Sequence, residues 1–409
     1  MNIKISVITI LSALLMGMQA HAAVSLCVNN PTNRQRNEVV AFDAKRVWNV
    51  LGVKEGTSLI VKDLYRLEIP SQLTHDNQLL IEATVMPMAT ARYTVEAGTP
   101  RTYKSAVDGY YSKWRVDDYT WENDKAIFRV YGPELQRRGE KAFGIDAWLK
   151  STEELEVRSR YNSFRKGCEE ADALRKEGNK AAADSVTLHT TWHLDHGTGL
   201  DCYNVGPSLG CGTPAIMLGD SIVMPWCYKE YKVLDNGPLR FTLQLLYPTT
   251  TINGAKVTEH RIISVDKGCY FNKMTVWYDG LNGVADVAGG VVMHDEQPNN
   301  LVIHRNYIAY SDPTDNPEKH NFQIYVGVVF PNGADKTTLV KDLYHQKQGI
   351  VGNAVGVRRC VKSNEKVTYW FGASWCKSGT PDQDTWISQI NKFIDNCNTP
   401  LNLSIQHKQ

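Results

Sequence analysis

Short apolar segments with a period of two run through this sequence, and they constrain the fold more than any other feature. Residues alternate or run apolar at strand length in VTEHRIISV (257–265), YFNKMTVWY (270–278) and FQIYVGVVF (322–330), and likewise in KAIFRVYG (125–132) and KVTYWFG (366–372). This pattern predicts β-strands, which turn residues such as Asp266-Lys267-Gly268 separate. Many strands at short spacing predict an all-β, mainly antiparallel protein built as a large β-sandwich.

Two helices are expected to interrupt the strands. Residues 166–183 (KGCEEADALRKEGNKAAA) are charged and alanine-rich, which predicts a solvent-facing helical insertion. A second helix is expected near 381–395, with Thr380 as its N-cap, Pro381 at its first position and Gln383 completing a capping box. The apolar stripe of this helix comprises Trp386, Ile387, Ile390, Phe393 and Ile394.

The first 22 residues have the pattern of a secretory signal peptide. Lys4 is their only charge, an apolar run follows from Ile5 to Met18, and Ala20-His21-Ala22 is a small-x-small cleavage signal. The apolar run is too short to cross a bilayer, and no later segment approaches a membrane helix. We expect cleavage after Ala22 and a periplasmic or secreted protein.

Composition limits the partners. Lys plus Arg (45) and Asp plus Glu (44) nearly cancel and no basic block stands out, so nucleic acid is not expected as a partner. The hydrophobic content of 42%, with 19 Tyr and 10 Trp, suits a large core and supplies flat rings that stack on sugars. Residues 23–409 are expected to form a single β-sandwich domain, with a small N-terminal lobe over 23–100 as the alternative. The oligomeric state is not defined by the sequence.

The segment HLDHGTGLDCYNVGPSLGCG (193–212) concentrates two histidines, two aspartates, a tyrosine and five glycines. It overlaps LHTTWHLDH (188–196), which is expected to be a strand with one core face and one presented face. The core face would hold Leu188, Trp192 and Leu194, and the presented face His189, His193 and Asp195. The glycines that follow allow a sharp turn or a close approach to a ligand.

Several interpretations of this segment stay open. A hydrogen-bonded turn explains its polarity without any function. A metal site would use His189 and His193 with Asp195 or His196, which are residue types that ligate zinc, although their spacing matches no strong motif. Glycoside hydrolysis needs two carboxylates, and the sequence offers Asp195, Asp201, Asp146 and Glu259.

Proton transfer at a sugar carbon is a further interpretation. Elimination beside a uronate carboxylate needs a base, a group that neutralises the carboxylate and an acid for the departing oxygen. The segment supplies His193 or His196 as base and Tyr203 as acid. Arg261 and Arg129, each on an expected strand, are candidates for the carboxylate clamp, with an ordinary ion pair as the alternative for each.

Residues outside the segment are further candidates. Glu259 and His260 are adjacent on one strand and should therefore point to opposite faces. His294 ends an apolar run, a position that often marks a site, or else it belongs to a solvated turn. Asp146 and Trp148 should share one face, which suits a sugar subsite and equally a buried hydrogen-bonded pair.

Five motifs, in order along most of the mature chain, resemble the domain-of-unknown-function family numbered 4861. They are WENDKAIFRVYGPEL (121–135), FGIDAWLK (143–150), HLDHGTGLDCYNVGPSLGCGTPAI (193–216), LDNGPLRFTLQLLY (234–247) and VTEHRIISVDKGCYFNKM (257–274). The resemblance implies a secreted, carbohydrate-directed protein of polysaccharide-degrading bacteria.

The chain also looks similar to the galactose-mutarotase-like supersandwich of aldose epimerases and several polysaccharide lyases. Those proteins use a His with a Glu or a Tyr on a broad concave sheet. That similarity implies the candidates His193, His196, His260, His294, Glu259 and Tyr203.

Our leading prediction is an exported enzyme that acts on uronic-acid-containing oligosaccharides by β-elimination or a dehydration-type proton transfer. The substrate-binding residues would be Asp146, Trp148, Arg129, Asp195, Asp201, Glu259 and His294. A glycoside hydrolase or sugar epimerase on the same fold, and a non-catalytic glycan-binding protein, are the alternatives. We expect no cofactor, with a divalent metal at His189, His193 and Asp195 as the remaining option.

Overall fold

The computed structural model describes residues 23–313 and 322–407. Neighbouring strands in this part of the chain pair antiparallel, while an isolated parallel bridge joins Ile145 and Gly210. The expectation of an all-β, mainly antiparallel sandwich is therefore confirmed. None of the helices in the described ranges is long and apolar enough to span a membrane. The expected signal peptide lies outside these ranges and stays a prediction.

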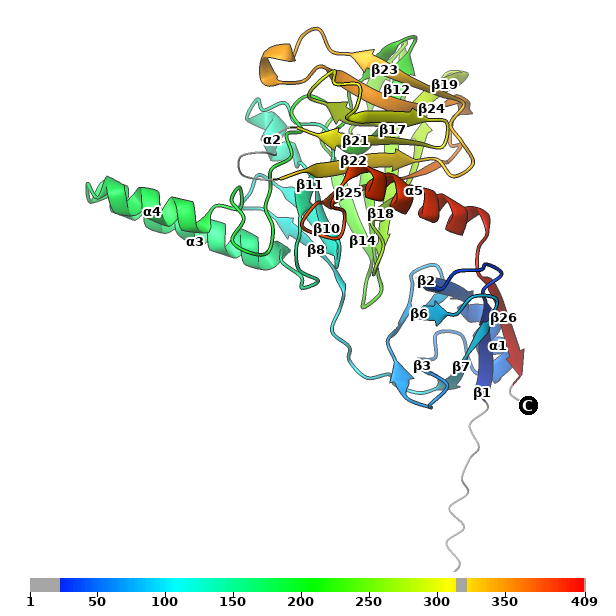
Figure 1. Cartoon of the computed structure of the whole chain (residues 1–409). Coiled ribbons are helices and arrows are strands. Elements are labelled where there is room, and N and C mark those ends of the chain that lie inside the picture. The colour runs from blue at the N-terminus through cyan, green and yellow to red at the C-terminus, as the bar shows by residue number, and fades with distance from the viewer. Residues whose placement is uncertain (1–22, 314–321, 408–409) are drawn as a thin grey trace, which may run out of the picture.

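Two large sheets form the body of the sandwich (Figure 1). The nine-stranded sheet runs β14 (Glu230–Asn236), β15 (Arg240–Leu246), β17 (Ala255–Asp266), β18 (Phe271–Asp279), β25 (Val367–Trp375), β22 (Ile324–Val329), β21 (Tyr307–Asp312) and β20 (Leu301–His304), with β16 (Thr250–Ile252) paired to β17. The five-stranded sheet runs β13 (Ser221–Val223), β12 (Cys211–Leu218), β19 (Val284–Met293), β24 (Gly352–Lys362) and β23 (Lys336–Lys341).

The two sheets approach closely where Gly212 of β12 meets β25. A side chain at Gly212 would collide with Phe371, and the residue has a φ of 90°, so only glycine suits the position. The hydroxyl of Tyr369 donates to the carbonyl of Gly212 at 2.6 Å. One of the glycines of the 193–212 segment thus serves sheet packing.

A four-stranded sheet of β11 (Asp146–Leu149), β10 (Ala126–Val130), β9 (Asp118–Asn123) and β8 (Val107–Ser112) packs on the nine-stranded sheet. The rings of Phe128 and Phe371 meet edge to face with centroids 5.6 Å apart. The indole N–H of Trp121 donates to Asn272 at 2.8 Å. These rings are core residues of the fold.

The N-terminal residues form two further sheets with their own apolar cluster. One sheet runs β26 (Asn402–His407), β1 (Ala23–Asn29), β7 (Thr90–Ala97), β3 (Leu59–Lys62) and β4 (Glu68–Ile69), and the other β2 (Arg36–Asp43), β6 (Gln78–Val85) and β5 (Ser71–Leu73). Strand β26 comes from the C-terminal end of the chain (Figure 1), which the sequence did not indicate. Polar contacts join this unit to the sandwich, among them His75 with Asp235 at 2.8 Å.

The expected helical insertion is present, but it is longer than predicted and broken in two. Helices α3 (Val157–Lys176) and α4 (Lys180–Thr190) form a hairpin that projects from the sandwich (Figure 1). The chain reverses at Gly178, where φ is 82°, and the side chain of Asn179 caps α4 by accepting from the amide of Ala182. The other helices within residues 23–313 and 322–407 are α1 (Ala44–Leu51), α2 (Pro133–Arg137), the 3₁₀ turn η2 (Gln346–Gln348) and α5 (Gln383–Asn398).

The prediction of a strand over residues 188–196 is wrong. Helix α4 continues to Thr190, and the chain then turns. Leu188 and Leu194, expected in the core, are 58% and 39% exposed, whereas Trp192 is buried. The helix persists because Thr190 packs against Gly167 of α3, so a tertiary contact decides a segment whose local pattern is ambiguous.

Helix α5 begins two residues later than predicted. Its N-cap is Asp382, which accepts from the amide of Thr385 at 2.7 Å. The expected cap, Thr380, is fully buried and its hydroxyl pairs with Ser374 at 2.6 Å. The apolar stripe is confirmed, since Trp386, Ile390 and Ile394 are buried.

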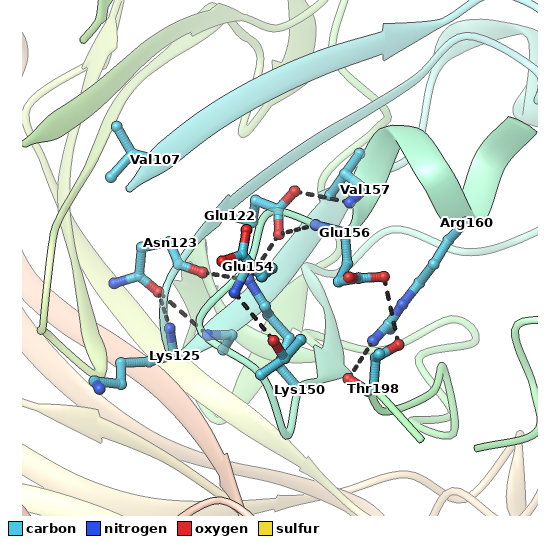
Figure 2. Close-up of polar contacts among 12 residues, drawn as sticks. Val107, Glu122, Asn123, Lys125, Lys150, Glu154, Glu156, Val157, Arg160 and Thr198 are labelled. Carbon is cyan, nitrogen blue, oxygen red and sulfur yellow. Dashed lines mark hydrogen bonds and ion pairs between the residues drawn. The ribbon is translucent and has the colours of Figure 1, made fainter. Parts of the chain in front are cut away.

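A buried ion pair fixes the start of α3 (Figure 2). The ammonium of Lys150 lies 2.9 Å from the carboxylate of Glu122, and both side chains are at most 1% exposed. Glu122 also accepts from the backbone amides of Glu156 at 2.9 Å and Val157 at 2.7 Å. A carboxylate near a helix N-terminus satisfies amides that have no partner within the helix.

Replacing Lys150 with Met should destabilise the protein by about 3–5 kcal/mol, because Glu122 would keep a buried charge without its cation. Urea unfolding measures the change. The matched control is Lys104→Met, which breaks the ion pair with Glu154, whose two side chains are 72% and 61% exposed. That control should cost no more than about 1 kcal/mol. Equal losses of unfolding free energy in Lys150→Met and Lys104→Met would contradict the argument that burial makes the Lys150–Glu122 pair costly to break.

Candidate active site

Three side chains from separate segments meet at one end of the sandwich: Tyr203, His294 and Asp312. Tyr203 lies in the loop between α4 and β12, His294 follows the last residue of β19, and Asp312 ends β21. The imidazole Nδ1 of His294 is 2.9 Å from a carboxylate oxygen of Asp312. The rings of Tyr203 and His294 meet edge to face with centroids 6.1 Å apart.

A tyrosine hydroxyl holds the backbone in place at this strand end. The phenol oxygen of Tyr310 accepts from the backbone amides of His294 at 3.0 Å and Asp295 at 3.1 Å. It donates in turn to the carboxylate of Asp295 at 3.0 Å. Because both backbone and ring of His294 are held, its imidazole has a defined orientation.

The protonation states follow from burial and charge. Burial alone disfavours the imidazolium, but the carboxylate of Asp312 outweighs it, so the pKa of His294 is raised. Burial raises the pKa of Tyr203 well above its usual value, which keeps the phenol protonated. Within the described ranges the Tyr203 hydroxyl is buried and has no hydrogen-bond partner. A buried hydroxyl of this kind is costly unless a ligand completes it.

A second polar cluster surrounds Arg129 on β10. Its guanidinium lies 2.5 Å from Asp146, 3.2 Å from Asp201 and 3.5 Å from Asp118. All four side chains are nearly or fully buried. Burial raises the pKa of Asp118 to about 6, although Arg129 opposes this shift. Arg129 is therefore a counter-ion for protein carboxylates, and its guanidinium is not presented to a substrate.

The two clusters adjoin one another. The charge of Asp146, beside Arg129, and that of Asp312, beside His294, both raise the pKa of Tyr203 and of Cys211. Burial is the larger cause for both groups. Tyr203 and Cys211 therefore lie within electrostatic reach of both clusters.

Asp146 and Trp148 form the buried hydrogen-bonded pair that was one of the two sequence interpretations. The indole N–H of Trp148 donates to Asp146 at 2.9 Å. The indole is fully buried, with its centroid 5.1 Å from that of Trp192. Trp148 therefore has no exposed ring face for a sugar.

His193 and His196 lie at the surface, apart from Tyr203 in the core. The side chain of His193 is 61% exposed, and its Nδ1 is 2.9 Å from the backbone oxygen of Asp201. His196 is exposed, with Nε2 2.8 Å from the carbonyl of Thr191. The structure thus does not bring these histidines together with Tyr203.

The other residues of the segment have separate partners. Asp195 pairs with Lys377 at 2.8 Å and accepts from the amides of Gly197 and Gly199. His189 lies on α4, with Nδ1 2.7 Å from the carbonyl of Ser185. His189, His193 and Asp195 do not converge, and the described part of the chain holds no group of three or more His, Cys, Asp or Glu side chains arranged for a metal ion.

Arg261 and Glu259 pair with each other on β17. The guanidinium of Arg261 is fully buried and stacks on the ring of Tyr247 at 4.0 Å. No hydrogen bond, ion pair or ring contact joins it to His193 or Tyr203 in the described ranges. His260 points to the other face, where its ring stacks on Trp277 at 4.9 Å, as the alternation predicted.

Sequence reasoning missed two residues of these clusters. Asp312 closes the apolar strand YIAYSD, so the strand-end signal that drew attention to His294 would also have found it. Asp118 carried no signal, because an Asp-Asp pair where a strand begins is ordinary.

Two solved structures align with this chain. A protein of glycosyl hydrolase family 38 from Enterococcus faecalis aligns with a TM-score of 0.51 at 9% identity, over 95% of this chain and 48% of that one. An α-mannosidase from E. faecalis V583 aligns with a TM-score of 0.49 at 10% identity, over 95% and 46%. The chain thus spans about half the length of these proteins. At 9% identity, the alignment with the glycosyl hydrolase family 38 protein shows a shared fold.

The protein is therefore a large antiparallel β-sandwich, and its fold also occurs in a protein of glycosyl hydrolase family 38. Within it, the family model described as "Domain of unknown function (DUF4861)" matches residues 28–403, and the chain belongs to this family. A relative named "Uncharacterized protein P7", from Formosa agariphila, is 29% identical over 309 residues, which is 71% of this chain and 68% of that protein.

Replacing Asp312 with Asn should lower the pKa of His294, because the carboxylate is what raises it. Imidazole proton NMR across a pH series measures this, with the His260 signal as an internal reference. The folded-state pKa lies above the unfolded value of about 6.5, so the pair stabilises the protein fully below that pH. This stabilisation is lost as the pH rises through the raised pKa. Identical NMR titration curves of His294 in the parent protein and in Asp312→Asn would contradict the role of Asp312 as the group that raises the pKa of His294.

Proposed function

We propose that this protein is an exported carbohydrate-active enzyme that acts on uronate-containing oligosaccharides by β-elimination or a related proton transfer. The observation that carries the proposal is the imidazole of His294, oriented by Asp312 at 2.9 Å and set beside the buried hydroxyl of Tyr203. The fold that this chain shares with a protein of glycosyl hydrolase family 38 supports a sugar as the substrate.

The geometry suits the two proton transfers that elimination requires. The base removes the proton from the carbon beside the uronate carboxylate, and the acid protonates the oxygen that leaves the next carbon. The C–H and C–O bonds break and a C=C bond forms. Neutral His294 takes the proton on its imidazole, because Asp312 at Nδ1 and the backbone of Asn204 both stabilise the imidazolium. Tyr203 gives its proton to the leaving oxygen.

This assignment revises the sequence-based roles. His294 replaces His193 and His196 as the base, because it is oriented, buried and adjacent to the acid. Arg129 is not used as a carboxylate clamp, since three protein carboxylates face it. Arg261 is not used because it pairs through Nε with Glu259, and no hydrogen bond or ion pair joins it to Tyr203 or His294 in the described ranges.

Hydrolysis is a second candidate, and the Arg129 cluster favours it. Glycoside hydrolysis uses two carboxyl groups, one of them held protonated. Asp118, with a pKa of about 6, lies on the same guanidinium as Asp146 and Asp201. Asp146 and Asp201 are bonded to Arg129, whereas the Tyr203 hydroxyl has no partner in the described ranges, so elimination is placed first.

The test is incubation of the purified protein with a panel of uronate oligosaccharides, followed by ultraviolet absorbance from a new conjugated double bond. Tyr203→Phe and His294→Gln should each lower the rate by about 100-fold or more. The matched control is His304→Gln, an exposed histidine that stacks on Tyr307 away from both clusters. It should keep the parent rate.

Other outcomes choose among the remaining candidates. If His193→Gln lowers the rate as much as His294→Gln does, the role of base belongs to His193. Reducing sugar without a double bond would replace elimination with hydrolysis. Altered anomeric equilibration at constant chain length would indicate an epimerase. Saturable binding with no product would leave a glycan-binding protein.

A further inference from the structure

A second pocket opens at the other end of strand β12 from the candidate active site. Cys211, within electrostatic reach of Asp146 and Asp312, begins β12, whereas Ile216 further along the strand lines the pocket. Five residues of extended chain separate these positions by about 16 Å. The pocket has a volume of about 170 Å³, which is below the roughly 300–1,000 Å³ of drug-sized sites and suits a single small ring.

The floor of this distal pocket is polar. Glu259 and Tyr278 both line it. Tyr278 is 2% exposed, and its hydroxyl has no hydrogen-bond partner in the described ranges. Behind them, Arg261 is fully buried and binds Glu259 through Nε. A buried hydroxyl left without a partner beside a cavity indicates that a ligand or water completes it.

The mouth of the distal pocket is aromatic. Trp226 lines the pocket and is 54% exposed, although large apolar side chains are usually covered. Its neighbour Cys227 is buried, which anchors the backbone beneath the ring. A flat indole above hydrogen-bonding groups matches a pyranose, which has apolar C–H faces and hydroxyls at its edge.

We propose that the distal pocket binds a neutral sugar ring. Trp226 stacks on one face of the ring, the Glu259 carboxylate accepts from a sugar hydroxyl, and the Tyr278 hydroxyl completes its hydrogen bonding on the same ligand. A uronate would bring a second negative charge beside Glu259, whose own charge Arg261 already compensates, so the pocket favours an uncharged ring. This role is independent of the chemistry proposed for Tyr203 and His294.

Isothermal titration calorimetry of the full chain with xylotriose, mannotriose and galactotriose tests the proposal. At least one of them should bind saturably. Trp226→Ala and Tyr278→Phe should each weaken binding about tenfold or more, since the loss of one good contact is worth about 1.4 kcal/mol. The matched control is Trp114→Ala, which removes another exposed tryptophan, 45% accessible and outside the pocket. It should bind as the parent does.

The result separates this inference from the proposed function. Binding that is absent for all three sugars or that persists in both pocket variants would overturn the inference. So would a uronate trisaccharide whose binding depends on Trp226 and is stronger than that of the three neutral sugars. Trp226→Ala should keep the parent rate on a short uronate substrate, because the residue lies away from the active site. An inactive parent protein that still binds through Trp226 and Tyr278 would refute elimination and leave the pocket assignment standing.

Discussion

The guanidinium of Arg129 holds together the end of the sandwich on which the candidate site is built. It faces Asp118 of β9, Asp146 of β11 and Asp201 of the loop that follows the helical hairpin. Removing four charged groups from water is costly, and burial raises the pKa of Asp118 although the charge of Arg129 opposes this shift. Because the ion pairs cross between strands and loop, they fix the loop against the sheet.

The position of Tyr203 follows from that constraint. Tyr203 comes two residues after Asp201, and backbone hydrogen bonds between Leu149 and Leu200 align the same loop with β11. The phenol is thereby held in the core next to His294. His294 and Asp312 close strands of two different sheets, and sheet packing brings them to hydrogen-bonding distance. A site assembled in this way is preorganised, because each member is fixed by an element that has other reasons to be rigid.

The two ends of the sandwich differ in chemistry. At one end, an oriented imidazole and a buried phenol suit proton transfer. At the other, Glu259 and Arg261 neutralise each other beneath Trp226, which suits uncharged hydroxyl groups. On the two proposals made above, one glycan would place a charged unit at the reactive end and a neutral unit at the distal pocket.

The sequence by itself determined the strands and the class. A period of two is enforced by burial of alternate side chains, so segments such as 257–265 specify their structure locally, and the same alternation correctly placed Glu259 and His260 on opposite faces. Segment 188–196 failed because its pattern fits a strand as well as a helix end, and packing of Thr190 on Gly167 decides between them. The sequence marked Tyr203 and His294 as polar candidates, but only sheet packing brings these two residues together across about ninety residues of chain. The ion pairs of Arg129 likewise depend on sheet packing, because their partners are Asp118, Asp146 and Asp201. Local patterns carry no information on which strand ends meet, and therefore only the tertiary structure decided the site.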